Sequence, residues 1–259
     1  MNAPLRSSPT GPLVPAPPWA NGRPAARAWR IRGPRRYYWS LAFFILLIAG
    51  SGIHAYRDLS RPDAWAYWKD LYVSPSMTAA LVPDASFNGT LHDRPALFLS
   101  GRVGAAAATW FREQLDKDHL VAGDTVVMTS AGGDLDQAVI MGEIIRARGL
   151  STAVGVIDGS GQVRPSRCAS ACVFIFAGGS VRFGVEGSRL GVHRFVIATP
   201  GRDPVAEAQR TTGLVLRYMT RMGVASSFVE AMSATSEIRW LGDREAVAMH
   251  LITDPVQLP

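Results

Sequence analysis

The stretch TVVMTSAGGDLDQAVIMGEIIRARGLSTAVGV, residues 125–156, decides the fold class of this chain. Residues 125–129 and 152–156 are short and largely apolar, a pattern that predicts two buried strands. Between them, residues 135–148 place apolar side chains at helical spacing, and Gly149 follows as a helix stop. A strand, a helix and a strand at this spacing predict a parallel crossover, so the expected class is α/β with a largely parallel sheet.

The same alternation continues on both sides of that stretch. Residues 96–100 predict a further strand, and residues 105–115 predict the helix that follows it. On the C-terminal side, residues 190–194 predict a strand, whereas the short apolar segment 169–176 fits either a strand or a buried helix. Further helices are predicted at residues 204–222, 224–233 and 243–250. The folded domain is therefore expected to span residues 93–259.

The composition excludes several classes of protein. With 47% hydrophobic residues and two cysteines in 259 residues, the chain is neither disordered throughout nor a disulfide framework. Its net charge of +6 is located before residue 37, where seven arginines and no acidic residue occur. Those seven charges exceed the total by one, so the remaining residues carry a net charge of −1. We therefore expect no nucleic-acid partner.

The N-terminal quarter of the sequence predicts an anchored protein. Residues 1–36 combine the arginines with eight prolines and are expected to form a disordered basic arm. Residues 37–54 follow as a transmembrane signal anchor in contact with lipid, because 17 of them carry no charge and reach about 25 Å. A buried core helix and a cleaved signal peptide are the alternatives. Residues 55–92 are expected to form a juxtamembrane connector, whose aromatic side chains lie along the membrane or pack on the domain.

Charge asymmetry predicts the orientation of that anchor. The positive-inside rule keeps the arginine-rich arm in the cytoplasm. The domain that follows is then expected outside it, in the periplasm of a bacterial-type inner membrane that the chain crosses once.

Three motifs carry residue types that are used in acyl transfer. The turn SAGGD, residues 130–134, offers backbone N–H groups to an oxyanion. The alternative is that its glycines are present only because a larger side chain would not fit the turn. Ser170 lies between two alanines at the start of a predicted buried segment, where a serine also serves as a helix cap. His193 ends a predicted strand, a place where a histidine is also found as an ordinary core residue. Together the three motifs supply a nucleophile, a base and an oxyanion site.

In this order, the glycine pair, the small-Ser-small motif and the strand ending in histidine resemble the proteolytic subunit of the Clp peptidase and its membrane-bound relatives. These proteins belong to the ClpP/crotonase superfamily. The resemblance covers residues 95–255 and includes RWL at 239–241 and the stretch 243–254, which is similar to the family's closing motif. It implies a ClpP/crotonase-like spiral of βα units, with a long helix at 204–222, and assembly into a homo-oligomeric ring.

The resemblance also implies a role for each matched position. Ser170 is the implied nucleophile and His193 its general base. Gly133 and Ala171 are the implied donors of the oxyanion hole, with Gly132 permitting the turn. The implied reaction is hydrolysis of peptide bonds in a flexible or unfolded polypeptide through an acyl-enzyme, with no metal or organic cofactor.

This sequence departs from the family at the third member of the triad. The position where the family has an acid is Ile238, and Glu237 precedes it. On a strand, Glu237 points to the opposite face, so it can serve as the acid only through a loop or a one-residue shift. The only lysines, Lys69 and Lys117, lie outside the motifs and supply no Ser–Lys arrangement.

Two other classes of function therefore remain open. One is a catalytically inactive ClpP-like fold that acts as a binding or envelope scaffold. The other is crotonase-type acyl-CoA chemistry, which fits poorly because an extracytoplasmic domain does not meet the CoA pool.

The two cysteines bracket the candidate nucleophile. Cys168 and Cys172 stand two residues before and two residues after Ser170. They are compatible with a disulfide, with two buried thiols, or with half of a metal site that lacks further nearby ligands.

Overall fold

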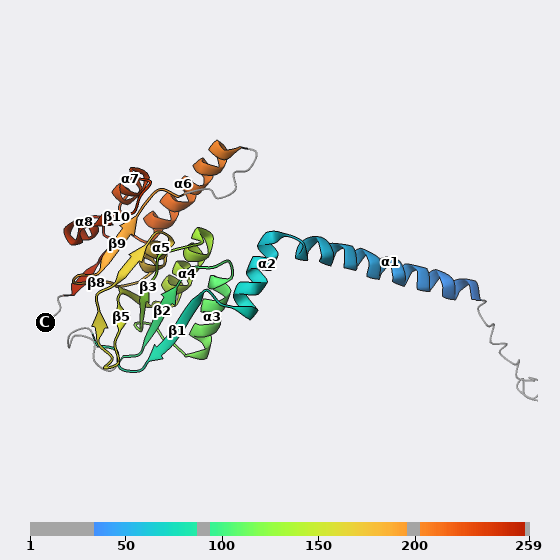
Figure 1. Ribbon diagram of the computed structural model, residues 1–259, viewed down its shortest axis with the longest axis horizontal. Coiled ribbons are helices and arrows are strands. Elements are labelled where there is room, and N and C mark those ends of the chain that lie inside the picture. Colours follow the sequence, from blue (N-terminus) through green and yellow to red (C-terminus); the bar gives the residue numbers. More distant parts are fainter. Residues whose placement is uncertain (1–33, 87–93, 196–202, 257–259) are drawn as a thin grey trace, which may run out of the picture. The chain divides into compact units, whose positions relative to one another are not determined.

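The computed structural model describes residues 34–86, 94–195 and 203–256 (Figure 1). The expected basic arm, residues 1–36, lies almost wholly outside this set. The chain divides into two compact units, residues 1–55 and 56–259, which are considered separately below.

The described part of the first unit forms one apolar helix, α1 (Pro34–Leu59), whose last four residues belong to the second unit. Its segment 38–59 has 22 residues and a mean hydropathy of 1.6, and its side chains are exposed. By length and composition, this segment can cross a membrane once. The helix continues five residues past the span expected at 37–54.

The second unit is built on a six-stranded sheet in the order β1-β2-β3-β4-β8-β11. Its strands are β1 (Met77–Val82), β2 (Ala96–Gly101), β3 (Thr125–Thr129), β4 (Ser151–Val154), β8 (Arg182–Val185) and β11 (Asp254–Val256). From β2 to β11 all neighbouring strands are parallel, and only β1 at the edge runs antiparallel. The predicted α/β class with a mostly parallel central sheet is confirmed.

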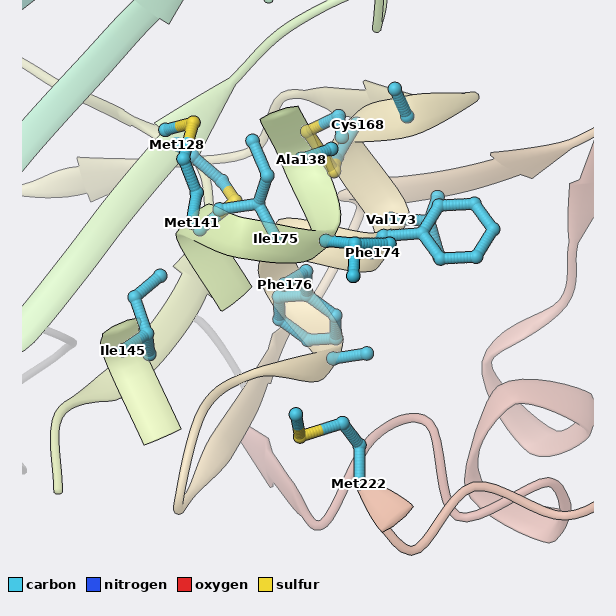
Figure 2. Packing of buried hydrophobic residues seen from close by; sticks show 14 of the residues in the cluster. Met128, Ala138, Met141, Ile145, Cys168, Val173, Phe174, Ile175, Phe176 and Met222 are labelled. Carbon is cyan, nitrogen blue, oxygen red and sulfur yellow. A yellow bond between two sulfur atoms is a disulfide. The ribbon is translucent and has the colours of Figure 1, made fainter. Parts of the chain in front are cut away.

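Successive side chains of a strand point to opposite faces of the sheet, and in this sheet both faces carry buried apolar side chains. Leu97, Leu99 and Met128 face the larger core cluster, which includes apolar side chains of α3 (Ala107–Lys117), α4 (Leu135–Ala147) and α5 (Ala171–Ala177). Figure 2 shows part of it, with Met141 and Ile145 of α4 near Ile175 and Phe176 of α5. The opposite face carries a smaller cluster, completed by the hairpin of β5 (Val156–Ile157) and β6 (Val163–Arg164).

A second sheet of three strands follows the order β10-β9-β7. It consists of β7 (Arg167–Ala169), β9 (Arg189–Val192) and β10 (Arg239–Leu241). The ambiguous segment 169–176 therefore divides at Ser170 into the end of a strand and the start of a helix. The C-terminal helices are α6 (Pro204–Arg221), α7 (Ser227–Ser233) and α8 (Asp243–Ala248), close to the predicted ranges.

The segment expected to be a connector contains more structure than its sequence indicated. It forms α2 (Pro62–Trp68), a short π-helix η1 (Lys69–Val73) and strand β1 of the main sheet. The Asp70 carboxylate accepts hydrogen bonds from the backbone N–H groups of Ser76 and Ala106, both at 2.9 Å. Regular structure of the second unit therefore begins well before residue 93. The expectation missed β1 because this edge strand is largely exposed and its apolar pattern is weak.

The C-terminal half is tied together by a buried arginine. Arg182 is 3% exposed, and its guanidinium donates to five backbone carbonyls near the ends of α5, α6 and α8. The acceptors are the carbonyl oxygens of Ala177, Gly179, Met222, His250 and Leu251. Burial, and secondarily the nearby charge of Arg146, lowers the pKa of Arg182 to about 10. Three helix ends, each carrying partial negative charge, thus meet on one cation.

Candidate active site

Ser170 lies on a sharp turn between β7 and α5. Its backbone has φ +56° and ψ −127°, a region that residues other than glycine rarely adopt. Its N–H donates to the carbonyl of Gly191 at 2.9 Å, which fixes the turn against β9. A serine on such a strand-to-helix turn presents its hydroxyl outward, as in the nucleophile elbow of hydrolases.

His193 directly follows β9 and reaches that hydroxyl. Strands β7 and β9 pair in parallel with Ala169 opposite Gly191, so the chain leaves both strands at the same edge. The distance from His193 Nε2 to Ser170 Oγ is 2.7 Å. The structure therefore brings together two of the predicted site residues that are 23 positions apart in the chain.

The other ring nitrogen of His193 contacts the backbone. Nδ1 lies 2.6 Å from the carbonyl oxygen of Arg194, and a carbonyl can only accept a hydrogen bond. Nδ1 must then carry the proton in the neutral ring, which leaves the lone pair of Nε2 to accept from the Ser170 hydroxyl. This is the tautomer that a general base needs.

Glu237 does not take part in this arrangement. It is exposed, and its backbone N–H and carbonyl both bond to the Thr235 hydroxyl. Among the described residues, no hydrogen bond or ion pair joins the Glu237 carboxylate to His193. Ile238, at the position of the family's acid, lies over Gly191, where a Cβ would be 2.7 Å from Ile238 Cγ2.

The glycine turn after β3 lies against the Ser170 turn. Gly132 has φ +98°, and a Cβ there would be 2.7 Å from both the Ala169 carbonyl oxygen and Ser170 Cβ. Only glycine allows this approach, so the turn requires Gly132 for steric reasons. Its N–H is already used, since it donates to Ser130 Oγ at 3.0 Å.

Two backbone N–H groups beside the serine have no acceptor. Within the described part of the chain, neither Gly133 nor Ala171 donates its N–H to another group. The Ala171 nitrogen would be 2.9 Å from a Cβ on Gly132, so it directly adjoins the glycine turn. These are the two donors that the sequence resemblance implied, and they are free to bind an oxygen that carries negative charge.

A disulfide closes the loop that carries Ser170. Cys168 and Cys172 are fully buried, their Cα atoms are 5.4 Å apart, and their sulfur atoms are bonded (Figure 2). Both flanks of the strained turn are thereby joined covalently. Elsewhere in the described residues, no cluster of three metal-binding side chains occurs.

The sequence did not identify the Arg194 carbonyl as the hydrogen-bond partner of His193. Every residue has a backbone carbonyl, so no residue type signals this role. The only available signal was negative, namely an isoleucine at the position expected to hold an acid.

The similarity of this chain to known proteins lies in its fold. No family model and no curated protein matches the chain. Among solved structures, the chain is similar to ClpP1 from Listeria monocytogenes, with 16% identity and a TM-score of 0.49, over 63% of this chain and 92% of that chain. A point mutant of the same protein gives 16% identity and a TM-score of 0.48, over 62% and 91% of the two chains.

Proposed function

We propose that this chain is a membrane-anchored, extracytoplasmic serine peptidase with a ClpP-like domain, acting on flexible polypeptides. The observation that carries the proposal is the 2.7 Å contact between Ser170 Oγ and His193 Nε2. It occurs on a strained turn beside two backbone N–H groups without acceptors, which together make up the parts of acyl transfer. The matching order of sequence motifs supports the same assignment.

The first half of the reaction forms the acyl-enzyme. Ser170 Oγ attacks the carbonyl carbon of the scissile peptide bond while its proton passes to His193 Nε2. The substrate oxygen gains negative charge and accepts hydrogen bonds from the N–H groups of Gly133 and Ala171. When the intermediate collapses, the C–N bond breaks and the protonated imidazole returns the proton to the leaving amine.

The second half releases the acid product. Water enters the place of the amine and gives a proton to His193 Nε2 as its oxygen attacks the acyl carbon. Collapse of this intermediate breaks the bond to Ser170 Oγ, which takes the proton back from the imidazole. No step requires a metal or an organic cofactor.

The carbonyl of Arg194 performs one of the two tasks of a triad acid. An acid holds the imidazole in the correct tautomer and stabilises its positive charge. Replacing the acid by a group that favours the wrong tautomer costs about 10⁴ in kcat. A carbonyl cannot donate, so here the correct tautomer is kept, and only part of the charge stabilisation is lost.

The disulfide supports a location outside the cytoplasm. Disulfides persist in oxidising compartments and are rare in the cytosol. The bond between Cys168 and Cys172 therefore agrees with the orientation inferred from the arginine-rich arm: residues 1–36 inside, residues 37–54 in the membrane, and the domain outside. Assembly into a homo-oligomeric ring belongs to the same proposal.

Covalent labelling tests the nucleophile. We expect a fluorophosphonate probe to label the full-length, detergent-solubilised protein, because the hydroxyl is activated by a neutral imidazole. Labelling is expected to vanish in Ser170→Ala and to persist in Ser233→Ala, a control on an exposed serine at the end of α7. Absence of labelling between about pH 6 and 9 would contradict a catalytic serine.

Reporter fusions test the orientation. Alkaline phosphatase folds actively only where its own disulfides form, so a fusion after residue 75 is expected to be active. A silent phosphatase, together with an active cytoplasmic reporter at the same site, would place the domain inside the cell.

The second candidate is a non-catalytic scaffold with the same fold. The observation in its favour is Ile238, an apolar residue where the family has its acid. The labelling experiment separates the two, because a scaffold has no need of a reactive serine.

A further inference from the structure

An open cavity of about 500 Å³ adjoins the Ser170 turn. Its lining includes Ala131, Ala169, Arg167, Ile238 and Trp240. Ala169 immediately precedes Ser170, and Ala131 immediately precedes Gly132. The two turns that carry the proposed nucleophile and oxyanion donors therefore also form part of the cavity wall, and its volume is within the range of ligand sites.

Part of the cavity wall belongs to the three-stranded sheet, through Arg167 and Ala169 of β7 and Trp240 of β10. Gly191 of β9 pairs with Ala169 on one side and with Trp240 on the other, so these residues form a row across the strands. A Cβ on Gly191 would be 2.7 Å from Ile238 and 2.8 Å from the Trp240 ring. The side chains of Ile238 and Trp240 thus lie over Gly191. His193 lies two residues after Gly191 in the chain.

Most of the wall offers apolar contact. Ile238 remains 44% exposed and Trp240 remains 36% exposed, although both are large and lie beside a cavity. The hydroxyls of the wall are already engaged: Thr129 Oγ1 with Ser166 Oγ, and Ser130 Oγ with the Gly101 carbonyl. A ligand of this wall therefore gains mainly by covering Ile238 and Trp240.

The lining of the cavity carries a positive charge. Arg167 is the only charged residue of the lining, and it stands opposite Arg189 on the neighbouring strand β9. None of the ion pairs among the described residues involves either arginine. Two cations in register repel each other, and an anion bound between them removes this repulsion. A guanidinium also binds a carboxylate through two parallel hydrogen bonds.

We propose that this cavity is a substrate subsite that takes a residue bearing a carboxylate, with the carboxylate on Arg167 and its hydrocarbon part against Ile238 and Trp240. The carboxylate comes from a Glu or Asp side chain or from the C-terminus of the polypeptide. The proposal rests on the proposed peptidase function, and it makes Arg167 the residue that determines specificity.

Matched peptides test the subsite and separate the two sources of the carboxylate. The probes are fluorescein-labelled heptapeptides that differ at one position in Glu, Gln or Lys, each with a free or an amidated C-terminus. With the full-length solubilised protein, the carboxylate form is expected to have a kcat/KM about 10- to 100-fold higher than its neutral counterpart, mainly through KM. If replacing Glu by Gln removes the preference, the carboxylate belongs to the side chain. If amidation removes the preference, it belongs to the C-terminus.

Variants of Arg167 assign the effect. Arg167→Gln is expected to abolish the preference, so that kcat/KM for the carboxylate peptide falls to the level of its neutral counterpart, and Arg167→Glu is expected to favour the Lys peptide. Arg217→Gln, on an exposed arginine of α6, is the control and keeps the preference. Equal cleavage of all peptides, or a preference that survives Arg167→Gln, would overturn the subsite and leave the peptidase proposal standing.

Binding to Ser170→Ala, measured by fluorescence anisotropy, makes the result independent of turnover. If no peptide is cleaved by the wild type but carboxylate peptides bind and Arg167→Gln weakens them about 10-fold or more, the subsite stands and the peptidase proposal falls. If peptides are neither cleaved nor bound, the subsite is overturned as well.

Discussion

His193→Ala is expected to lower kcat/KM for peptide hydrolysis by about 10⁴-fold or more. In the proposed mechanism, the imidazole accepts the Ser170 proton in one step and returns it to the amine in the next, so its loss affects both barriers. In enzymes where serine and histidine act as a unit, removing either one costs about as much as removing both. We therefore expect Ser170→Ala, His193→Ala and the double variant to have nearly the same residual rate.

The measurement is steady-state hydrolysis of a fluorogenic peptide by the full-length solubilised protein. His119→Asn is the matched control, because His119 is an exposed histidine in the left-handed region, a conformation that asparagine tolerates. A loss of less than about 10-fold in His193→Ala would show that another group removes the proton.

Glu237→Gln distinguishes the carbonyl from a carboxylate as the partner of His193. Because Nδ1 is bonded to the Arg194 carbonyl, the variant is expected to retain kcat/KM within about twofold. A loss near that of His193→Ala would instead mean that the loop around Glu237 rearranges to supply the acid during turnover.

Arg182→Met is expected to lower the free energy of unfolding by about 2–4 kcal/mol. Methionine is similar in length but donates no hydrogen bond, so the carbonyls of Gly179, His250 and Leu251 lose their charged donor, whereas those of Ala177 and Met222 keep Arg146. Burial lowers the pKa of Arg182 because the charged form loses its hydration, so removing the charge removes part of an unfavourable contribution. The lost hydrogen bonds outweigh this gain, because buried carbonyls without donors each cost about 1–3 kcal/mol.

Urea unfolding followed by tryptophan fluorescence measures this change. Arg217→Met is the control, since Arg217 is exposed on α6, and its midpoint is expected to stay close to that of the wild type. An equally stable Arg182→Met would mean that water or Arg146, which also donates to the Ala177 and Met222 carbonyls, replaces the missing donor.

How far the sequence predicts this molecule depends on the range of the interactions involved. The strand, helix and strand at 125–156 follow from local apolar spacing, and the structure places β3, α4 and β4 there. Strand β1 escaped prediction because an exposed edge strand has little apolar periodicity. The segment 169–176 was ambiguous because its division depends on one backbone angle, the φ of Ser170, which pairing with β9 imposes.

The candidate site shows the same limit. The glycine pair, Ser170 and His193 were identified from their residue types, and the fold brings them together. The partner of Nδ1 was not identifiable, because the relevant atom belongs to the main chain and its position depends on where the chain turns after β9. Residue identity predicts the chemistry of a side chain. It does not predict which main-chain carbonyl lies beside the imidazole of His193.

The parts of the site belong to two different sheets. Ser170 and His193 follow β7 and β9 of the three-stranded sheet, whereas Gly133 follows β3 of the six-stranded sheet. Two backbone hydrogen bonds, from Ser130 to Arg167 and from Ala169 to Ser130, couple the sheets at this point. Sliding one sheet past the other would alter the spacing between the Ser170 hydroxyl and the Gly133 amide, while the spacings from that hydroxyl to the Ala171 amide and to the His193 ring would stay the same. In the proposed mechanism, only one of the two donors that stabilise the developing charge therefore depends on the relative position of the sheets.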